Sequence, residues 1–338
     1  MDANIAVTGI GSLPYLTLDE AMCDIDRHAP LVPYTPQLPK TGRFGQMLFE
    51  PFLGLEDLIV AGDSGGKASI QKGALDSLAQ RIEDLSRSPY CDPNVLTARD
   101  HLLRTSRTSS PLIAVKTQHV GPITFLTQLQ YCGRPAISDS DASTALLSLM
   151  TDRLKKQCAA LQDTGAKLLF VLDEPVLPFL RKADLAPKGP AVRALSRAIR
   201  CIQDCGAEAG IHCCAPLPGP FLQSVLEDVG ITLLSVAIDA AKELEHSVHP
   251  PLVRSILERG LMLWGMVPTA AAQTKSLPAH DLVAWLRTAQ QTVDLPEAHF
   301  LAHSLVTPHC GTGLLTTEQS THIFDVCQEV SERMRCQK

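Results

Sequence analysis

A histidine and two cysteines are the residues of this 338-residue sequence best suited to bind a metal ion. His212 and Cys214 stand on either side of Cys213 at the end of an apolar, strand-like run, and Cys310 follows another such run much later in the chain. Side chains alternate between the two faces of an extended segment, so His212 and Cys214 should point the same way and Cys213 elsewhere. One imidazole and two thiolates are typical ligands of a catalytic zinc, which keeps a further position for substrate. The spacing therefore predicts a metal site, with buried structural cysteines as the alternative.

Two adjacent acids are the next candidates. Asp173 and Glu174 directly follow the apolar run Leu168–Leu172 and precede Pro175. Acids that end a buried strand can accept an ammonium group or act as a catalytic base. We therefore take both as candidate catalytic residues. Acids that merely start a helix are the alternative interpretation.

A loop of small residues follows the first strand-like run. Gly9–Ser12 lacks the third glycine of a dinucleotide-binding loop and leads into Leu13-Pro14, which argues against phosphate binding. The backbone amides of Gly11 and Ser12 can instead bind a carboxylate. Three histidines also fall near strand ends and are interpreted as polar loop residues rather than ligands: His119, His303 and His309.

The elements that must position these residues are short apolar runs alternating with amphipathic helices. Eight runs predict strands: Ile5–Thr8, Leu31–Tyr34, Leu112–Lys116, Leu168–Leu172, Ala209–Cys213, Thr232–Val236, Leu261–Met266 and Phe300–Val306. Thr17 and Glu20 form a capping box that starts a helix. A second helix should begin at Ser140 and stop near Gly165, and a C-terminal one should begin at Thr316.

Eight strands separated by helices predict a distorted (β/α)8 barrel, with a doubly wound sheet as the alternative. In a barrel of this kind the loops after the strands meet at one end, which would bring the candidate residues together. We expect one domain over residues 1–338, elaborated by extra helices between about Lys40 and Pro111.

The composition excludes several classes of function. With 30 Lys and Arg against 36 Asp and Glu, the net charge is −6, which does not favour binding to nucleic acid or to a membrane. The first residues lack the features of a secretory signal, so we expect a cytoplasmic protein. In a reducing compartment its cysteines should be thiols, and any that function would be metal ligands or nucleophiles.

Seven motifs in order resemble cobalamin-independent methionine synthase. They are more similar still to the short single-barrel members of the uroporphyrinogen decarboxylase/methionine synthase superfamily, and they extend over most of the chain. The motifs are TGIGSLP (Thr8–Pro14), PQLPK (Pro36–Lys40), VGPITF (Val120–Phe125), LDEP (Leu172–Pro175), GIHCC (Gly210–Cys214), WGMVPT (Trp264–Thr269) and TPHCGTG (Thr307–Gly313).

The resemblance implies a barrel with a Zn²⁺ ion that binds the thiol of homocysteine. His212, Cys214 and Cys310 match the family's zinc ligands, and Asp173 matches the residue that binds the amino group. The resemblance also places the substrate carboxylate at Gly11 and Ser12. A free thiol is mostly protonated at neutral pH, whereas a metal-bound thiol is deprotonated, so zinc would supply a nucleophile for an electrophilic methyl group.

Two departures from the family bear on the ligands and on the methyl donor. The family supplies a Glu as a further zinc ligand, but Leu233–Ala240 contains none; Ser235 and Asp239 are the nearby polar residues. The full-length synthase also uses an N-terminal barrel to bind folate, which this sequence does not contain. We therefore expect methylcobalamin or a corrinoid protein as the donor rather than methyltetrahydrofolate.

The sequence thus predicts a zinc-dependent methyltransferase whose acceptor is a small thiol, with homocysteine and the product methionine as the leading pair. One alternative is a corrinoid-dependent methyltransferase with another thiol acceptor, although Asp173 suits an acceptor that carries an ammonium group. Others are a porphyrin decarboxylase, which needs no metal, and a zinc- or thiol-binding paralogue without catalytic activity.

Overall fold

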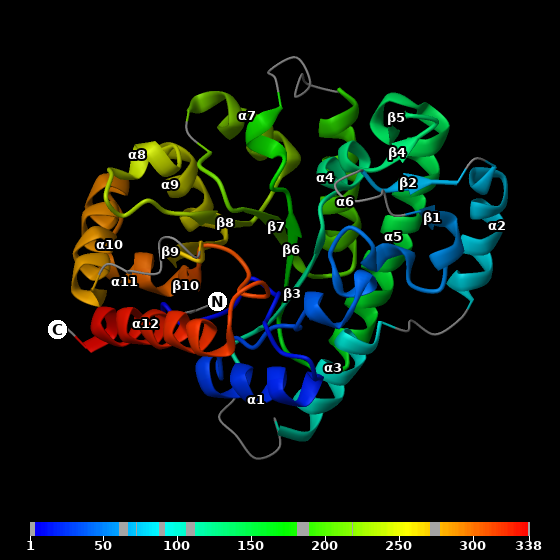
Figure 1. Cartoon of the computed structure of the whole chain (residues 1–338). Helices are drawn as coiled ribbons and strands as arrows, with labels where there is room; N and C mark the ends of the chain where they lie inside the picture. Colours follow the sequence, from blue (N-terminus) through cyan, green and yellow to red (C-terminus); the bar gives the residue numbers. More distant parts are fainter. Residues whose placement is uncertain are drawn as a thin grey trace.

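The computed structural model of the chain has a parallel sheet at its centre, surrounded by helices (Figure 1). The structure describes residues 4–60, 67–71, 73–87, 92–105, 112–180, 189–217, 219–270 and 278–336. Six strands lie in the order β10-β9-β8-β7-β6-β3, and every neighbouring pair is parallel. Their bounds are β3 (Val115–Val120), β6 (Leu168–Asp173), β7 (Glu208–Cys213), β8 (Leu233–Ala237), β9 (Leu261–Val267) and β10 (Ser304–Pro308).

Two further segments complete the barrel, each through a single bridge. Val7 pairs with Val306 of β10, and Tyr34 pairs with Lys116 of β3, so the two outermost strands each gain a neighbour. A bridge between Ser12 and the residue Gln37 joins these two segments to each other. Eight chain segments therefore close into a distorted (β/α)8 barrel, as predicted.

The second segment is irregular because of its prolines. Pro33 and Pro36 have no N–H group to donate, so the segment cannot form a continuous ladder. Its backbone bonds towards β3 run from Ile113 N to Leu31 O, at 2.9 Å, from Lys116 N to Pro33 O, at 2.8 Å, and from Thr35 N to Lys116 O, at 3.0 Å. The predicted strand Leu31–Tyr34 is thus in place but reduced to these contacts.

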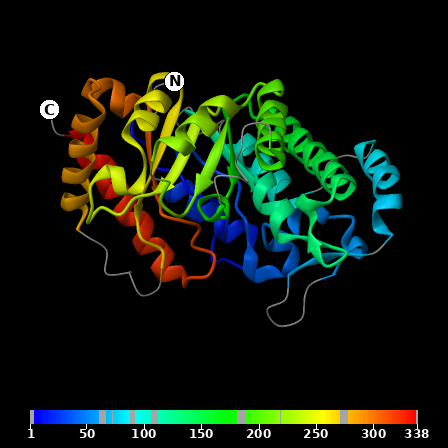
Figure 2. The ribbon, with the colours of Figure 1, turned by 90° about the horizontal axis from the view of Figure 1, so that it is seen from above.

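The helices form the outer layer of the barrel (Figure 2). Several begin at a proline, whose missing N–H costs nothing at a first helical position. Their bounds are α1 (Leu18–His28), α2 (Ala74–Ser86), α3 (Pro93–Thr105), α4 (Pro122–Gln128), α5 (Ser140–Gln162), α6 (Pro190–Asp204), α7 (Pro220–Val229), α8 (Leu244–Ser247), α9 (Pro250–Arg259), α10 (Ala279–Val293), α11 (Glu297–Ala302) and α12 (Thr317–Cys336). None of the helices described is long and apolar enough to cross a membrane.

The predicted starts of three helices and the predicted end of one are confirmed. Thr17 and Glu20 form the reciprocal capping box of α1. Helix α5 begins at Ser140 behind the cap Asp139, and the chain turns at Gly165 with a φ of 70°. Thr316 and Gln319 exchange hydrogen bonds at the start of α12.

Two strand predictions have wrong boundaries. Strand β3 runs to Val120 rather than ending at Lys116, and β10 begins only at Ser304. Phe300 belongs to α11, where its ring packs 5.5 Å from that of Trp264. Phe300 is therefore apolar because it packs against a strand from a helix, and not because it belongs to a strand.

The segment after the second barrel strand carries extra elements, as predicted. It contains the 3₁₀ helices η1 (Pro39–Thr41), η2 (Arg43–Gly45), η3 (Glu50–Phe52) and η4 (Glu56–Leu58), the short strands β1 (Ile59–Val60) and β2 (Ser69–Ile70), and α2 and α3. With β4 (Gln130–Tyr131) and β5 (Arg134–Pro135), β1 and β2 form a small second sheet at one side of the molecule (Figure 1). Two further 3₁₀ turns complete the elements, η5 (Ala136–Ser138) and η6 (Leu177–Phe179).

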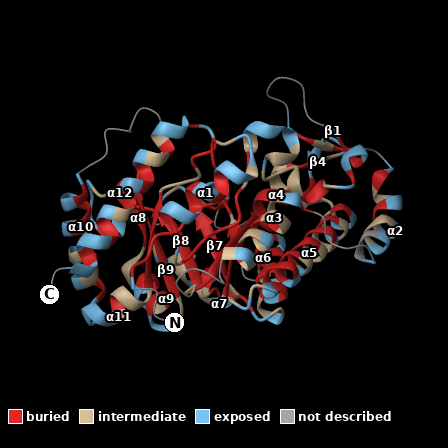
Figure 3. Ribbon diagram, turned by 90° about the horizontal axis from the view of Figure 1, so that it is seen from below, coloured by how far each residue is buried: buried red, intermediate tan, exposed pale blue. Residues whose placement is uncertain are grey.

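The apolar core lies on both faces of the barrel wall. Buried residues concentrate on the strands and on the inner sides of the helices (Figure 3). A second, smaller cluster of buried apolar side chains is separate from the main core. Each barrel segment that contributes to it supplies one or two residues, which is typical of the side chains that fill a barrel's interior. It comprises Ala6, Val32, Ala114, Leu169, Val171, Leu233, Leu261, Leu263 and Leu305.

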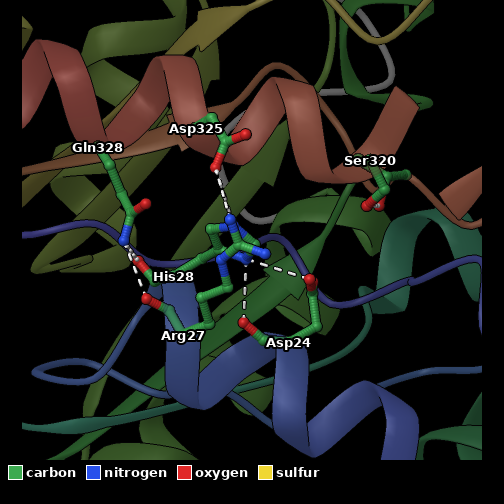
Figure 4. Close-up of polar contacts among 7 residues, drawn as sticks. Asp24, Arg27, His28, Ser320, Asp325 and Gln328 are labelled. Atoms are coloured by element: carbon green, nitrogen blue, oxygen red, sulfur yellow. Dashed lines mark hydrogen bonds and ion pairs between the residues drawn. The ribbon is translucent and has the colours of Figure 1, made fainter. Parts of the chain in front are cut away.

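A buried histidine joins the first and last helices of the barrel. His28 of α1 lies between Asp24 of its own helix and Asp325 of α12 (Figure 4). Its Nδ1 is 3.0 Å from the Asp24 carbonyl oxygen and 3.1 Å from Asp24 Oδ1, and its Nε2 is 3.2 Å from Asp325 Oδ1. Because both ring nitrogens face oxygen acceptors, the site fits the protonated imidazolium. Burial alone would lower the pKa of His28, but the two aspartates outweigh it and raise that pKa above 6.5.

This arrangement predicts a pH-dependent contribution to stability. A raised pKa in the folded state stabilises the protein fully below about pH 6.5 and ceases to do so as the pH rises through the raised value. Replacement of His28 by Gln should therefore lower the free energy of unfolding by about 1–2 kcal/mol more at pH 6 than at pH 9. Denaturant titrations at the two pH values measure this difference. The more exposed pair of His101 and Asp26 offers a control, since His101→Gln should change stability little at either pH.

Candidate active site

The interior of the barrel changes from apolar to polar towards the carboxyl ends of its strands. On five barrel segments an apolar inward residue is followed, two positions later on the same face, by a polar one. The polar residues are Thr8, Lys116, Asp173, Ser235 and Thr307. The register pairs Asp173 with His212 and His212 with Ser235, so these three lie side by side on β6, β7 and β8. This polar layer is the floor of the candidate site.

The structure brings the three predicted metal ligands together. One ligand atom each of His212, Cys214 and Cys310 lies within 4.8 Å of the other two. His212 and Cys214 come from the end of β7, and Cys310 comes from the loop after β10. Cys213 is fully buried in the outer core instead, as alternation along the strand requires.

The ring of His212 is oriented by β8. Ser235 Oγ lies 2.8 Å from His212 Nδ1, and His212 Nε2 is buried with no hydrogen-bond partner. A buried ring nitrogen without a partner is costly unless something binds it. Because Ser235 contacts one ring nitrogen and leaves the other without a partner, it orients the ring in the way that a residue behind a metal ligand does.

The two thiols differ in acidity. A hydrogen bond from the Cys310 thiol, together with His212, lowers the pKa of Cys214 to about 4. The same bond and burial raise the pKa of Cys310, because a second thiolate beside the first is repelled. Two thiolates can therefore coexist here only with a cation between them.

Neither of the polar residues considered for a further ligand joins the three. Ser235 is engaged with His212, and Asp239 pairs with Lys242 at 2.9 Å and accepts from Ala241 N at 3.2 Å.

His309, the residue before Cys310, has an Nε2 atom with no partner, and burial lowers its pKa to about 4, so its ring is neutral. A neutral imidazole is the form that binds metals.

Asp173 offers a free oxygen to the site. Its Oδ1 is buried without a partner. Burial raises the pKa of Asp173 to about 6, although His212 and Lys116 oppose the rise. The carboxyl group thus lies beside the proposed ligands with an acceptor available for a substrate.

Glu174 has its carboxylate turned to the neighbouring helix. It accepts from the amides of Ile123 and Thr124, both at 2.8 Å, and from the Thr124 hydroxyl at 2.7 Å. These donors stand at the start of α4, and Gly121 leaves the room that the carboxylate fills. Burial raises the pKa of Glu174 to about 7 against the effect of these bonds. The geometry assigns Glu174 to anchoring α4 beside the site, a role that the adjacent acids in the sequence did not reveal.

The loop of Gly11 and Ser12 lies against the loop that carries Cys310. Thr312 N donates to Ser12 O at 2.8 Å, and a side chain at Gly311 would collide with Ser12 Oγ. Gly11 has a φ of 148°, and a side chain there would overlap Gln118. Both the backbone conformation and the close approach therefore require glycine at this position.

Lys116 is a functional candidate that the sequence alone did not indicate. It is fully buried on β3, and its Nζ donates to Ile10 O at 2.7 Å and to Gln118 Oε1 at 3.1 Å. Burial lowers the pKa of Lys116 to about 8, while Asp173 opposes the change. Lys116 thus ties β3 to the loop of Gly11 and Ser12. A buried lysine without a direct ion pair is rare outside functional sites.

The other two candidate histidines are not members of the cluster of His212, Cys214 and Cys310. His119 Nδ1 is 3.0 Å from the carbonyl oxygen of Val120, and burial lowers its pKa to about 4. His303 precedes β10, at the opposite end of the strand from Cys310, and stacks on His299 with ring centres 4.3 Å apart.

The fold is similar to that of solved methyltransferases. One is a B12-independent methionine synthase from a Shewanella species, in complex with selenomethionine; it is 13% identical, the alignment covers 98% of each chain, and the TM-score is 0.63. Another is a methyltransferase from Methanosarcina mazei, 14% identical over 96% of this chain and 94% of that one, with a TM-score of 0.56. No protein-family model and no curated protein matches the sequence. At these identities the likeness establishes a shared fold.

The two neighbouring acids should respond differently to loss of charge. Glu174→Gln should lower the free energy of unfolding by about 1–3 kcal/mol, because an amide cannot accept from all three donors of α4. Asp173→Asn should cost less, since Asp173 Oδ1 has no partner to lose. Urea denaturation of the two variants compares them directly. A greater loss in Asp173→Asn would contradict the roles assigned here.

Proposed function

We propose that this protein is a zinc-dependent methyltransferase that transfers a methyl group to a small thiol, with homocysteine as the leading acceptor and methionine as the product. The observation that carries the proposal is the cluster of His212, Cys214 and Cys310 beside the free oxygen of Asp173. The shared fold with methionine synthase and methyltransferase structures supports it, and one of those structures holds a methionine analogue.

The donor set fits zinc. One imidazole nitrogen and two thiol sulfurs are soft and intermediate ligands of the kind that zinc prefers, and three protein ligands leave a position for a substrate. The buried, unpartnered Nε2 of His212 supports this fit, since a metal would satisfy it. Zinc, when bound, makes a coordinated thiol a thiolate at neutral pH.

The chain's own residues would then select and orient the acceptor. Asp173 would accept hydrogen bonds from the ammonium group, and the amides of Gly11 and Ser12 would hold the carboxylate. Ser235 would keep His212 in its orientation. Charge-assisted contacts to the ammonium and carboxylate groups, which share one carbon, would fix that end of the molecule, and this is how a site aligns the sulfur at the other end with an incoming methyl group.

The proposed reaction needs a donor with an electrophilic methyl group. Methylcobalamin, a corrinoid protein and methyltetrahydrofolate can each present an electrophilic methyl group. Incubating the protein with homocysteine and each small donor in turn, and measuring methionine, distinguishes them.

We expect the purified protein to contain about one zinc per chain. Cys310→Ser should remove most of it while the barrel stays folded, because residues at the mouth contribute little to the core. Elemental analysis with circular dichroism measures both. Cys213→Ala is the matched control, since this neighbouring thiol faces the outer core and its loss should leave the metal in place. Full zinc content in Cys310→Ser would contradict the ligand assignment.

We also expect Asp173→Asn to discriminate between acceptors. The variant should weaken homocysteine binding by about tenfold to a hundredfold, the equivalent of about 1.5–3 kcal/mol for a hydrogen bond to a charged group. Binding of 4-mercaptobutanoate, which is homocysteine without its amino group, should change little. Calorimetric titration of both thiols tests this, and equal losses would show that Asp173 does not recognise the ammonium group.

A further inference from the structure

Two buried hydroxyl groups in the barrel wall have no hydrogen-bond partner. They belong to Thr8 and Thr307, which are both 0% exposed, and the Oγ1 atom of each is unpaired. A buried hydroxyl without a partner is costly, so native proteins usually satisfy it with water or with a ligand. The function proposed above gives neither hydroxyl a role.

The two hydroxyls lie side by side on the interior face of the wall. Thr8 N donates to Val306 O at 3.0 Å, and Val306 N donates to Ala6 O at 2.9 Å, so the first barrel segment runs parallel to β10 with Thr8 next to Thr307. Two positions earlier on the same face stand Ala6 and Leu305, which belong to the interior cluster. The hydroxyls therefore point into the barrel, as its alternation requires.

A buried ammonium group reaches the same part of the wall. Lys116 is 0% exposed on β3, and its Nζ atom donates to Ile10 O at 2.7 Å and to Gln118 Oε1 at 3.1 Å. Ile10 stands two residues after Thr8, so the lysine side chain extends past the second barrel segment to the first. An ammonium group has three N–H donors, and the third has no acceptor among the residues that the structure describes.

This ammonium group is bonded only to neutral oxygen atoms. Burial lowers the pKa of Lys116 to about 8 and Asp173 opposes that change, so the group is still charged at neutral pH. A buried charge that is not paired with an opposite one is costly. An anion bound beside Lys116 would offset this cost and would accept its third N–H.

The loops of the candidate site continue directly from these groups. Ile10, which accepts from Lys116, is followed by Gly11 and Ser12, and Thr307 stands three residues before Cys310. The amides of Gly11 and Ser12 donate to no acceptor within the described part of the chain. One ammonium group, two hydroxyls and two amides are therefore gathered as available donors on one side of the mouth.

We propose that Lys116, Thr8 and Thr307 form a buried pocket for the carboxylate of the thiol acceptor. The proposal rests on the function proposed above, in which the acceptor is an amino-acid thiol. Lys116 supplies the opposite charge through its third N–H group, and the two hydroxyls donate hydrogen bonds in addition to the loop amides. These three residues thus make the carboxylate a requirement for tight binding.

The charge balance favours a zwitterion over water or a simple anion in this pocket. Water would satisfy the two hydroxyls and the third N–H, but it carries no charge to balance Lys116. A simple anion would balance Lys116 but would be repelled by Asp173, which carries a free oxygen on β6. An amino-acid head group brings an ammonium for Asp173 together with its carboxylate, so both buried charges are paired at once.

The test compares three thiols that differ only in their charged groups. They are homocysteine, 4-mercaptobutanoate, which lacks the amino group, and 3-aminopropane-1-thiol, which lacks the carboxylate. Calorimetric titration should show that the zinc-loaded protein binds homocysteine about tenfold to a hundredfold more tightly than 3-aminopropane-1-thiol. Lys116→Met removes the charge and keeps the length of the side chain. It should weaken both carboxylate thiols by about the same factor and 3-aminopropane-1-thiol by less than about twofold.

The hydroxyls provide a second test with a matched control. Thr8→Val and Thr307→Val should each weaken the two carboxylate thiols by about threefold to tenfold without lowering the free energy of unfolding, because the lost hydroxyl has no partner in the empty protein. The control is Thr117→Val, since the buried Thr117 hydroxyl lies 2.8 Å from Thr35 Oγ1 and accepts from Gln157 Nε2 at 2.5 Å. This variant should lose stability and keep its affinity for all three thiols.

The outcomes separate this assignment from the proposed function. Equal weakening of all three thiols in Lys116→Met, with zinc content unchanged, would show a structural role. Equal affinity of the wild type for homocysteine and 3-aminopropane-1-thiol would show that the pocket holds water only. Either result overturns the assignment but leaves the methyl transfer standing if methionine is formed. If Lys116→Met does not fold by circular dichroism, the two threonine variants decide. Failure of the zinc-loaded wild type to bind any thiol would overturn the proposed function and this assignment with it.

Discussion

The register of three neighbouring strands determines the site. The hydrogen bonds between β6, β7 and β8 set Asp173 beside His212 and His212 beside Ser235. A shift of one residue in either pairing would turn His212 out of the barrel and bring Cys213 in. The outward residues of β7 oppose such a shift, because it would turn Ala209 and Ile211 from the outer core towards the interior of the barrel. Packing outside the barrel wall thus maintains the geometry of the site inside it.

Closure of the barrel places the remaining parts of the site on this frame. The first two segments hold the wall together with few bonds, and the second is interrupted by prolines. Side chains compensate for the missing ladder: Lys116 reaches Ile10 O, and Gln118 Nε2 donates to Thr35 O at 2.8 Å. The hydrogen bonds of the Lys116 ammonium group therefore offset part of the cost of burying it, and they do so where regular strand pairing is weakest.

Alternation and strand ends made much of this structure predictable. The order of strands and helices, the capping boxes and the candidates at strand ends all follow from local patterns. Strand β3 shows where such patterns fail: Lys116 and Gln118 face a polar interior, so the apolar run stops early although the strand continues to Val120. Polar residues that line a site interrupt the signal by which a strand is recognised.

Contacts between segments that are distant in the sequence could not be predicted, because no local pattern indicates which of them will meet. Glu174 reads as a second acid next to Asp173, and only the position of α4 shows that its carboxylate is already used. Glu50 lies in a segment of irregular turns, where no periodicity indicates that its carboxylate will accept a hydrogen bond from Gln37. This contact depends on how that segment folds over the barrel, which is a property of tertiary structure alone.

The charge balance of the mouth links these observations. Cys214, Cys310 and Asp173 are acidic groups placed close together, and Lys116 is the buried base whose charge opposes that of Asp173. Burial makes each anion costly, as the raised pKa values of Asp173 and Cys310 show. A doubly charged cation among the thiols and an ammonium group at Asp173 would remove both costs together. The arrangement is therefore complementary to a metal ion and an amino-acid thiol bound at the same time. The metal ion would neutralise the thiolates, and the ammonium group of the amino-acid thiol would neutralise Asp173.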